Sequence, residues 1–242
     1  MSETRRLRYL EAMGIQAWAE RGADPAPARP EPAAAPASVV MRAAPATDVA
    51  GGDVARLDWE ALQARVKACA LCGLEKTRTQ TVFGVGNRQA TWMVVGEAPG
   101  ADEDRQGEPF VGRAGQLLNE MLWALGLARE AVYIANVLKC RPPNNRDPSP
   151  DEVACCEPYL KRQVALIRPK IILAVGRIAA QNLLKTDTRI GALRGRVHRY
   201  ADTGVPLIVT YHPAYLLRSP LEKRKAWDDL QLAARTLGAA AG

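Results

Sequence analysis

The sequence predicts an α/β fold in which a parallel sheet is covered by helices on both faces. From about residue 54 onward, short apolar runs of strand length alternate with segments of helical periodicity. In such an alternation, helices connect parallel strands, and functional residues gather at the carboxyl ends of the strands. The apolar content of 48% and the charged content of 24% are typical of a folded globular protein. They exclude a wholly disordered or fibrous chain.

Each element of this fold is predicted by its own residues. Asp58 is placed to cap the first helix, and Gly126 ends the apolar stripe of the second. The third helix has Ser149 at its N-cap, Pro150 at N1 and Glu152 at N3. The strands are expected at 92–96, 132–138, 170–176 and 206–211, and the helices at 56–68, 114–125, 150–167, 177–184 and 221–237.

The first 52 residues differ from the rest in charge and composition. They hold six basic and six acidic residues, so the excess of seven positive charges lies in 53–242. Residues 53–242 must therefore carry any basic face for nucleic acid, and 54–242 are expected to form the catalytic domain. Residues 23–53 are dominated by Ala, Pro and Gly and contain no aromatic residue, which predicts an extended linker.

The segment before this linker, 1–22, is predicted to be an interaction peptide. Leu7, Leu10 and Met13 stand at helical spacing, and Trp18 follows as a large apolar anchor. One interpretation is a helix that folds back on the main domain. The other is a peptide that docks on a partner, with the linker providing its reach.

No part of the chain has the features of a membrane or secretory segment. No apolar run approaches the ~20 residues that span a bilayer, and the N-terminus lacks the uninterrupted apolar stretch of a signal peptide. We therefore expect a cytoplasmic protein, a monomer without membrane attachment.

Unusual residues follow the predicted strands. The first strand leads into a loop rich in Gly, Pro and acidic residues at 96–104, the second into Asn136 and Cys140, and the fourth into His212. The loop at 96–104 has neither the Gly-Lys-Ser/Thr ending of a phosphate-binding loop nor the Gly-x-Gly-x-x-Gly pattern of a dinucleotide site. A nucleotide hydrolase is therefore disfavoured.

Four cysteines have the spacing of metal ligands. Cys69 and Cys72 form a C-x2-C pair, and Cys140 and Cys156 enclose 15 residues. Structural disulfides are improbable in a cytosolic chain. Cys155 and Cys156 would point about 100° apart on a helix, so only one of them is expected to face a shared site. The spacing alone accepts either zinc or a [4Fe–4S] cluster.

Three motifs resemble the family 4, iron–sulfur uracil-DNA glycosylases. They are Gly-Glu-Ala-Pro-Gly-x-x-Glu-Asp from residue 96 with Pro-Phe-Val-Gly at 109–112, Cys-Arg-Pro-Pro at 140–143 four residues after Asn136, and His-Pro-Ala-Tyr-Leu-Leu-Arg at 212–218. The resemblance covers about 69–235 in collinear order. It implies a three-layer α/β/α fold with a four-stranded parallel sheet, a [4Fe–4S] cluster and excision of uracil from DNA.

The resemblance also implies the site residues. The cluster ligands would be Cys69, Cys72, Cys140 and Cys156. The catalytic residues would be Glu97, Glu103, Asn136 and His212. The substrate-binding residues would be Gly96, Ala98, Phe110, Asn136, Asn145, His212, Leu216 and Arg218. Related proteins that attach covalently to DNA carry a reactive His after the second strand, whereas 141–147 contains none, which favours turnover.

These residue types suit the chemistry of a glycosylase, which extrudes the nucleotide and holds its base by one face and its Watson–Crick edge. Phe110 can stack on uracil, Asn136 can pair with N3–H and O4, and His212 can donate to O2. The alternatives are a core Phe, a turn-capping Asn and a structural His. Glu97 and Glu103 can orient water or stabilise a developing oxocarbenium ion, and Glu97 can equally tie the loop through backbone N–H groups.

DNA contact is predicted from the segment after His212. The apolar side chains of Tyr215, Leu216 and Leu217 would fill the gap left by the extruded base while Arg218 meets phosphate; the alternative is a helix that packs Leu216 and Leu217 inward. His198 has no motif and is left unassigned. The wider basic face has as candidates Lys139, Arg141, Arg146, Arg194 and Arg196.

Two other functions and one partner are considered. The other functions are a glycosylase for another deaminated base and a non-catalytic Fe–S adaptor at the replication machinery; intact Glu97, Asn136 and His212 disfavour the adaptor. Residues 5–18 resemble the N-terminal segment of the psi subunit of the bacterial replicative clamp loader. That resemblance implies docking on the clamp loader and a nucleoid-associated repair enzyme.

Overall fold

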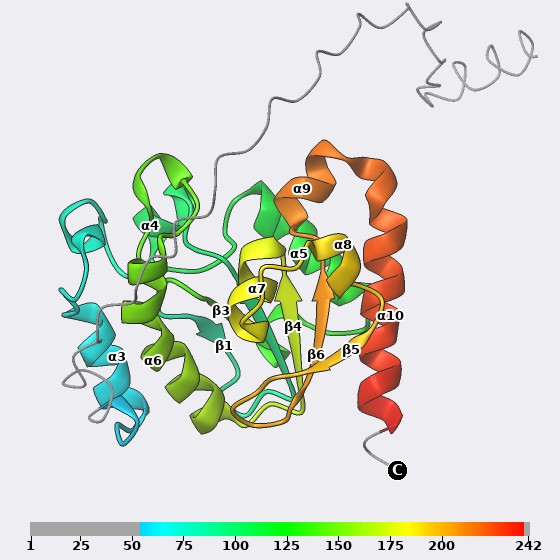
Figure 1. Ribbon diagram of the computed structural model, residues 1–242, viewed down its shortest axis with the longest axis horizontal. Coiled ribbons are helices and arrows are strands. Elements are labelled where there is room, and N and C mark those ends of the chain that lie inside the picture. Colours follow the sequence, from blue (N-terminus) through cyan, green and yellow to red (C-terminus); the bar gives the residue numbers. More distant parts are fainter. Residues whose placement is uncertain (1–53, 240–242) are drawn as a thin grey trace, which may run out of the picture. The chain divides into compact units, whose positions relative to one another are not determined.

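The computed structural model describes residues 54–239, and these form a three-layer structure around a six-stranded mixed sheet (Figure 1). The predicted peptide 1–22 and linker 23–53 lie outside the described residues, which begin at the first residue of the predicted domain. The sheet order is β1-β3-β2-β4-β6-β5. The strands are β1 (Val85–Gly86), β2 (Trp92–Gly96), β3 (Tyr133–Asn136), β4 (Ile171–Val175), β5 (Val197–Arg199) and β6 (Pro206–Thr210).

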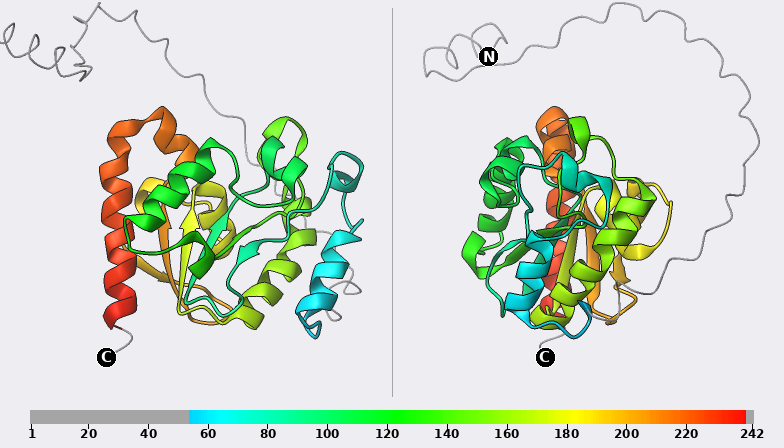
Figure 2. Two further views of the ribbon diagram at one scale, coloured as in Figure 1. Left: turned by 180° about the vertical axis from the view of Figure 1, so that it is seen from behind. Right: turned by 90° about the vertical axis from the view of Figure 1, so that its left-hand side faces the viewer.

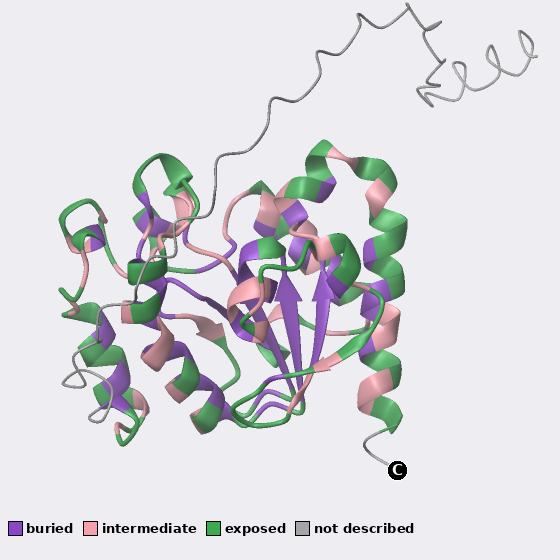
Figure 3. Cartoon of the chain, in the orientation of Figure 1, coloured by how far each residue is buried: buried purple, intermediate pink, exposed green. Residues whose placement is uncertain are grey.

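The four predicted strands are the four central ones, β3, β2, β4 and β6, and every pair among them is parallel. Their burial is almost complete, which explains why they read as continuous apolar runs (Figure 3). The predicted count of four strands is wrong, because β1 and β5 add antiparallel edges. These edges are only two and three residues long, too short to produce a periodic pattern.

The helices cover both faces of the sheet, as predicted. Leu160 and Val164 of α6 pack on one face, while Leu118 and Leu122 of α5 pack on the other (Figure 2). The helices are α3 (Trp59–Lys67), α4 (Ala101–Gln106), α5 (Arg113–Trp123), α6 (Pro150–Ile167), α7 (Arg177–Leu184), α8 (Ile190–Leu193), α9 (Pro213–Arg218) and α10 (Lys223–Ala239). Single 3-10 turns are η1 (Gly73–Lys76), η2 (Arg129–Ala131), η3 (Pro143–Asn145) and η4 (Pro220–Glu222).

Helix signals in the sequence are confirmed where a capping residue marks the start. The Asp58 side chain accepts from the N–H of Ala61 at 2.8 Å. The Ser149 hydroxyl accepts from the N–H of Glu152, whose carboxylate accepts from the N–H of Ser149. The short helices α4, α8 and α9 were not predicted as helices, because six residues or fewer show no helical period.

The carboxyl ends of the parallel strands meet at one edge of the sheet, where α4 and α9 also lie (Figure 1). Four connections leave the sheet there: 97–112 after β2, 137–149 after β3, 176 after β4 and 211–218 after β6. This is the edge at which the predicted site residues were expected. Within 54–239, no helix is both long and apolar enough to cross a membrane.

Candidate active site

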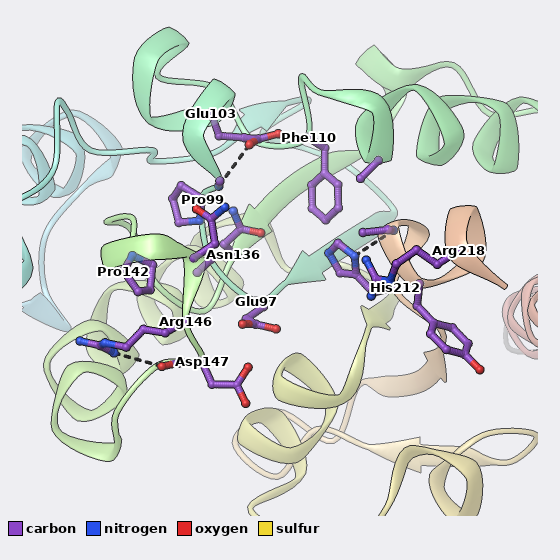
Figure 4. Close-up of a pocket in the computed structure, with 16 residues that line it drawn as sticks. Glu97, Pro99, Glu103, Phe110, Asn136, Pro142, Arg146, Asp147, His212 and Arg218 are labelled. Atoms are coloured by element: carbon purple, nitrogen blue, oxygen red, sulfur yellow. Dashed lines mark hydrogen bonds between the residues drawn. The ribbon is translucent and has the colours of Figure 1, made fainter. Parts of the chain in front are cut away.

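A cavity of about 460 Å³ opens at this edge of the sheet (Figure 4). Its walls come from the connections after β2, β3 and β6, so residues distant in sequence converge on it. It is lined by Glu97, Ala98, Pro99, Gly100, Glu103, Phe110, Ala114, Asn136, Pro142, Asn145, Arg146, Asp147, His212, Ala214, Tyr215 and Arg218. The structure therefore brings the predicted residues of all three motifs to one place.

Asn136 presents an unpaired acceptor in this cavity. It is the last residue of β3, it is 2% exposed, and its Oδ1 has no hydrogen-bond partner among the described residues. Gly96 lies beside it: a Cβ at Gly96 would stand 2.4 Å from that oxygen. Because buried polar atoms are normally paired, the free oxygen marks a place where a ligand donates a hydrogen bond.

Phe110 forms a second wall of the cavity. Its backbone φ is 56°, and its ring stacks on the ring of His212 with centroids 5.6 Å apart and an interplanar angle of 28°. A Cβ at Gly96 would lie 2.6 Å from its Cζ. Because residue 96 is glycine, the Phe110 ring and the Asn136 amide can pack next to each other against its backbone.

Glu103 holds the loop that carries Phe110. Its Oε1 accepts from the N–H groups of Val111 and Gly112 at 3.0 and 3.2 Å, and its Oε2 accepts from the N–H of Gly100 at 3.1 Å. Both carboxylate oxygens are therefore used by the backbone. In this structure the side chain ties the loop by fixing the two residues after Phe110, and a catalytic role of Glu103 stays a prediction.

His212 caps α9 and is fixed in one tautomer. Its Nδ1 accepts from the N–H of Ala214 at 3.1 Å, so the proton of the neutral ring is on Nε2. Burial, together with the positive charge of Arg218, lowers the pKa of His212 to about 4, against the opposing effect of Glu103. The imidazole is neutral at pH 7 and offers an Nε2–H donor at the cavity.

Glu97 follows β2 and has an unusual acidity. Burial and the negative charge of Asp147 raise its pKa to about 7, while the charge of Arg177 opposes that rise. Arg177 Nη2 and Asp147 Oδ2 form an ion pair at 2.5 Å. The sequence interpretation missed Asp147 and Arg177. For Arg177, its place directly after Gly176 at the end of β4 was the available signal.

The segment after His212 divides the apolar side chains that were predicted to fill the gap of an extruded base. Leu216 is 1% exposed and packs in the core with residues of α5 and α10, as in the alternative interpretation. Tyr215 and Leu217 are the exposed apolar residues of the segment, and Leu221 follows it. Arg218 lines the cavity as predicted for a residue of the site. Because a six-residue helix begins at Pro213, Leu216 faces inward and Leu217 outward.

Two candidates for the basic face have structural contacts. Lys139 is 1% exposed and lies inside the domain. Arg194 donates from Nε to the buried carboxylate of Asp229 at 2.6 Å, and its guanidinium lies over the ring of Tyr211 at 4.2 Å. Neither residue is available on a surface. The Asn145 side chain, also at the cavity, accepts from Arg141 Nε at 2.7 Å.

The four predicted ligand cysteines come from three segments that lie close together. Cys140 and Cys156 are buried, and the thiols of Cys69 and Cys72 are near enough to influence the acidity of Cys140. Arg78 joins two of the segments, since it donates to Cys140 Sγ at 3.0 Å and to the carbonyl of Cys69 at 2.7 Å.

Cys155 lies beside this group, since the thiols of Cys69 and Cys72 influence its acidity as they do that of Cys140. Its thiol is half-buried and donates to the carbonyl of Leu71 at 3.4 Å, whereas the neighbouring Cys156 is 2% exposed. Of the two adjacent cysteines, Cys156 is the one that turns into the core.

The donor set fits an iron–sulfur cluster held by thiolates. Burial raises the pKa of Cys156 to about 12 and also raises that of Cys140, so a positively charged ligand is needed to keep both ionised. In the described part of the chain, no group of three or more His, Cys, Asp or Glu side chains is gathered around the position of one metal ion.

Comparison with known proteins identifies the family. Residues 83–231 match the uracil DNA glycosylase superfamily. A type-4 uracil-DNA glycosylase of Archaeoglobus fulgidus is 51% identical over 172 residues, which cover 69% of this chain and 86% of the relative. A type-4 uracil-DNA glycosylase of Pyrobaculum aerophilum is 44% identical over 182 residues, covering 73% of this chain and 93% of the relative.

A bacterial relative gives the same result. The type-4 uracil-DNA glycosylase of Thermotoga maritima is 45% identical over 161 residues, which cover 66% of this chain and 83% of the relative. The matched residues include the strands, the connections at their carboxyl ends and the cavity they form. The chain belongs to the type-4 uracil-DNA glycosylases of the uracil DNA glycosylase superfamily.

Proposed function

We propose that this chain is a monofunctional uracil-DNA glycosylase that hydrolyses the N-glycosidic bond of uracil in DNA and leaves an abasic site for base excision repair. The observation that carries the proposal is the buried, unpaired Oδ1 of Asn136 beside the rings of Phe110 and His212. The family membership supports the same reaction.

Base selection follows from this pocket. An extruded uracil stacks on Phe110, donates its N3–H to Asn136 Oδ1 and accepts at O4 from the Asn136 amide. Cytosine lacks the N3–H donor, so with the Asn136 amide in this orientation it leaves the buried oxygen unpaired. A site built around an unpaired acceptor rejects such a base by the cost of leaving that acceptor buried without a partner.

Bond breaking is assisted at both ends of the scissile bond. His212 donates its Nε2–H to uracil O2 as negative charge develops on the leaving base, and a neutral donor is sufficient for this role. The Glu97 carboxylate faces the sugar, orients a water for attack on C1′ and stabilises the cationic sugar. The water supplies a hydroxyl to C1′ and a proton to the departing uracil.

DNA binding would use Arg218 for phosphate and the exposed Leu217 for the space that the extruded nucleotide leaves. Leu217 is one of the apolar side chains that the sequence predicted for this role. Because phosphate contacts release counterions, binding should weaken steeply with salt.

The four cysteines Cys69, Cys72, Cys140 and Cys156 would hold a [4Fe–4S] cluster. When bound, the cluster ties the chain after α3 to the segment after β3 and to α6. It would thereby stabilise one side of the base pocket. Purified protein should contain about four irons per chain and absorb broadly near ~400 nm; one zinc and no iron would contradict the assignment.

Residues 5–18 would dock on the replicative clamp loader, a proposal based on their sequence alone. A labelled peptide of residues 1–22 should bind purified clamp loader saturably. The same peptide with Trp18→Ala should bind much more weakly. Absence of saturable binding by the unchanged peptide would contradict this proposal.

One assay tests the enzymatic proposal. Protein is incubated with oligonucleotides that carry a single uracil, hypoxanthine, xanthine or thymine, and alkali then cleaves at any abasic site. Alkali-dependent cleavage at uracil supports the proposal, and absence of cleavage without alkali supports the monofunctional assignment. Faster cleavage at hypoxanthine or xanthine would favour a different base, and binding without cleavage would favour an adaptor.

A further inference from the structure

A lysine with a buried ammonium lies between the cysteine site and the base pocket. Lys139 is 1% exposed, and its Nζ donates to the carbonyl of Asn136 at 2.9 Å and to Gln163 Oε1 at 2.6 Å. A buried ammonium is costly unless hydrogen bonds and an opposite charge compensate it. Both of these acceptors are neutral, and burial lowers the pKa of Lys139 to about 7 while Cys156 and Cys140 oppose that fall. The side chain therefore keeps its charge at neutral pH only when an anion lies beside it.

The surrounding ionisable groups are thiols of the cysteine site. Cys140 follows Lys139 in the chain, and the sulfur of Cys156 faces both the ammonium and the backbone N–H of Lys139. Four thiolates around an iron–sulfur cluster carry a net negative charge. Lys139 is therefore placed to balance that charge from the side of the base pocket, whereas Arg78 donates to Cys140 from another segment.

Gln163 fixes the ammonium in this position. Gln163 is fully buried, and its Nε2 donates to the carbonyl of Phe83 at 2.9 Å and to the hydroxyl of Tyr133 at 3.2 Å. Gln163 and Cys156 stand seven residues apart on α6, about two turns, so they share a face of that helix. The helix that supplies a cysteine thus also supplies the anchor for Lys139.

We propose, on the basis of the function proposed above, that Lys139 is a positioning residue: its ammonium compensates the charge of the loaded cysteine site and holds the main chain of Asn136. The position of the Asn136 amide, which reads the base, therefore depends on whether the cysteine site holds its cluster. The hydrogen bonds after β3 extend the effect, because the N–H groups of Val137 and Leu138 donate to the carbonyls of Gly96 and Glu97 at 2.9 and 3.0 Å.

The test compares Lys139→Met and Gln163→Met with wild-type full-length protein, all purified without oxygen. Lys139→Met keeps the length of the side chain and removes its charge, whereas Gln163→Met removes one acceptor and keeps the ammonium. Lys170→Met, at an exposed lysine before β4, is the matched control. Iron content, cluster reduction potential, the rate of iron loss to a chelator and single-turnover excision of uracil are measured.

In Lys139→Met we expect a more negative reduction potential, since removal of a positive charge disfavours addition of an electron. We also expect iron loss at least ~10-fold faster and excision at least ~10-fold slower, as loss of a charged buried hydrogen bond allows. Gln163→Met should slow excision less and leave the potential near that of wild type. Unchanged potential, iron loss and excision in Lys139→Met would overturn the proposal.

A variant without iron is interpreted by its stability. If Lys139→Met cannot be reconstituted with iron and sulfide but melts like chelator-stripped wild type, the ammonium is needed for loading and the proposal is supported. If it melts well below stripped wild type, Lys139 is merely structural and the proposal is wrong. A wild-type protein that holds iron but does not excise uracil contradicts the proposed function instead, and the comparison of potentials still tests Lys139.

Discussion

The base pocket and the cysteine site prepare for their ligands in opposite ways. In the pocket, the polar groups are in place before a ligand binds. The N–H of Ala214 fixes the tautomer of His212, and Asn136 Oδ1 is buried without a hydrogen-bond partner among the described residues. In the cysteine site, burial raises the pKa of Cys156 to about 12, so the donors ionise only when a cationic group binds.

This difference separates the consequences of mutation in the two regions. Pocket residues contact the ligand through atoms that the fold does not use, so their loss should reduce chemistry and spare stability. The cysteines join three chain segments, so their loss should reduce stability first and catalysis as a consequence. The segment 136–140 belongs to both regions, so mutations there should affect catalysis and stability together.

The largest expected effect is the loss of a buried cysteine ligand. Cys156→Ser should abolish iron binding and lower the melting temperature, and uracil excision should fall with it, because the chain loses a link between α6 and the other two segments. Cys155→Ser, at the half-buried neighbour, is the control and should retain wild-type iron content. Iron per chain and thermal melting are the measurements. Wild-type iron in Cys156→Ser would contradict the assignment.

The next largest effect belongs to the pocket. His212→Ala and Asn136→Ala should each slow single-turnover excision of uracil by at least ~10²-fold, as loss of a transition-state hydrogen bond in a buried site does. Iron content should stay near wild type in both variants, in contrast to Cys156→Ser. The melting temperature should stay near wild type in Asn136→Ala and fall modestly in His212→Ala, because His212 also caps α9. His198→Ala is the control, since His198 contacts the carbonyl of Leu193 away from the cavity. Full single-turnover activity in His212→Ala would show that the leaving-group assignment is wrong.

Sequence reasoning succeeded where a residue's role is local. The cap at Ser149 and the apolar runs of the four central strands are set by neighbouring residues, and the structure confirms them. Glycine, asparagine and histidine at strand ends also predicted which segments meet at the cavity. These features depend on residue type and spacing, which the sequence displays directly.

It failed where a role depends on contacts across the chain. The sequence did not show that the carboxylate of Glu103 accepts three backbone N–H groups, two of them eight and nine residues away. Leu216 and Leu217 are identical in type, and only the start of α9 decides which one is buried. Lys139 was expected on a basic face because a lysine is seldom buried.

A smaller effect is expected at the glycine that makes room for two pocket side chains. In Gly96→Ala, the new Cβ would stand 2.4 Å from Asn136 Oδ1 and 2.6 Å from Phe110 Cζ, so one or both must move. We expect kcat/KM for uracil-containing DNA to fall about 10-fold to 100-fold, since small displacements of positioned groups cost this much. Gly191→Ala, where nothing lies within 4 Å, is the control. Wild-type kcat/KM in Gly96→Ala would mean that the pocket tolerates a wider spacing.

The smallest effect concerns the acidity of Glu97, which links the pocket to charges at its rim. Catalysis requires the carboxylate, whose pKa is raised to about 7, so excision should rise with pH through about 7 while His212 stays neutral. Arg177→Gln removes a charge that lowers this pKa; the midpoint should therefore move to higher pH. Asp147→Asn removes a charge that raises it and should move the midpoint to lower pH.

The size of the effect is limited. At a fixed pH below 7, Arg177→Gln should slow excision by less than about 10-fold, because one pKa unit corresponds to tenfold. Both variants should match wild type well above pH 7. Single-turnover rates over the pH range measure the two shifts. If they have the same sign, the dependence does not come from the charges of the Asp147–Arg177 pair.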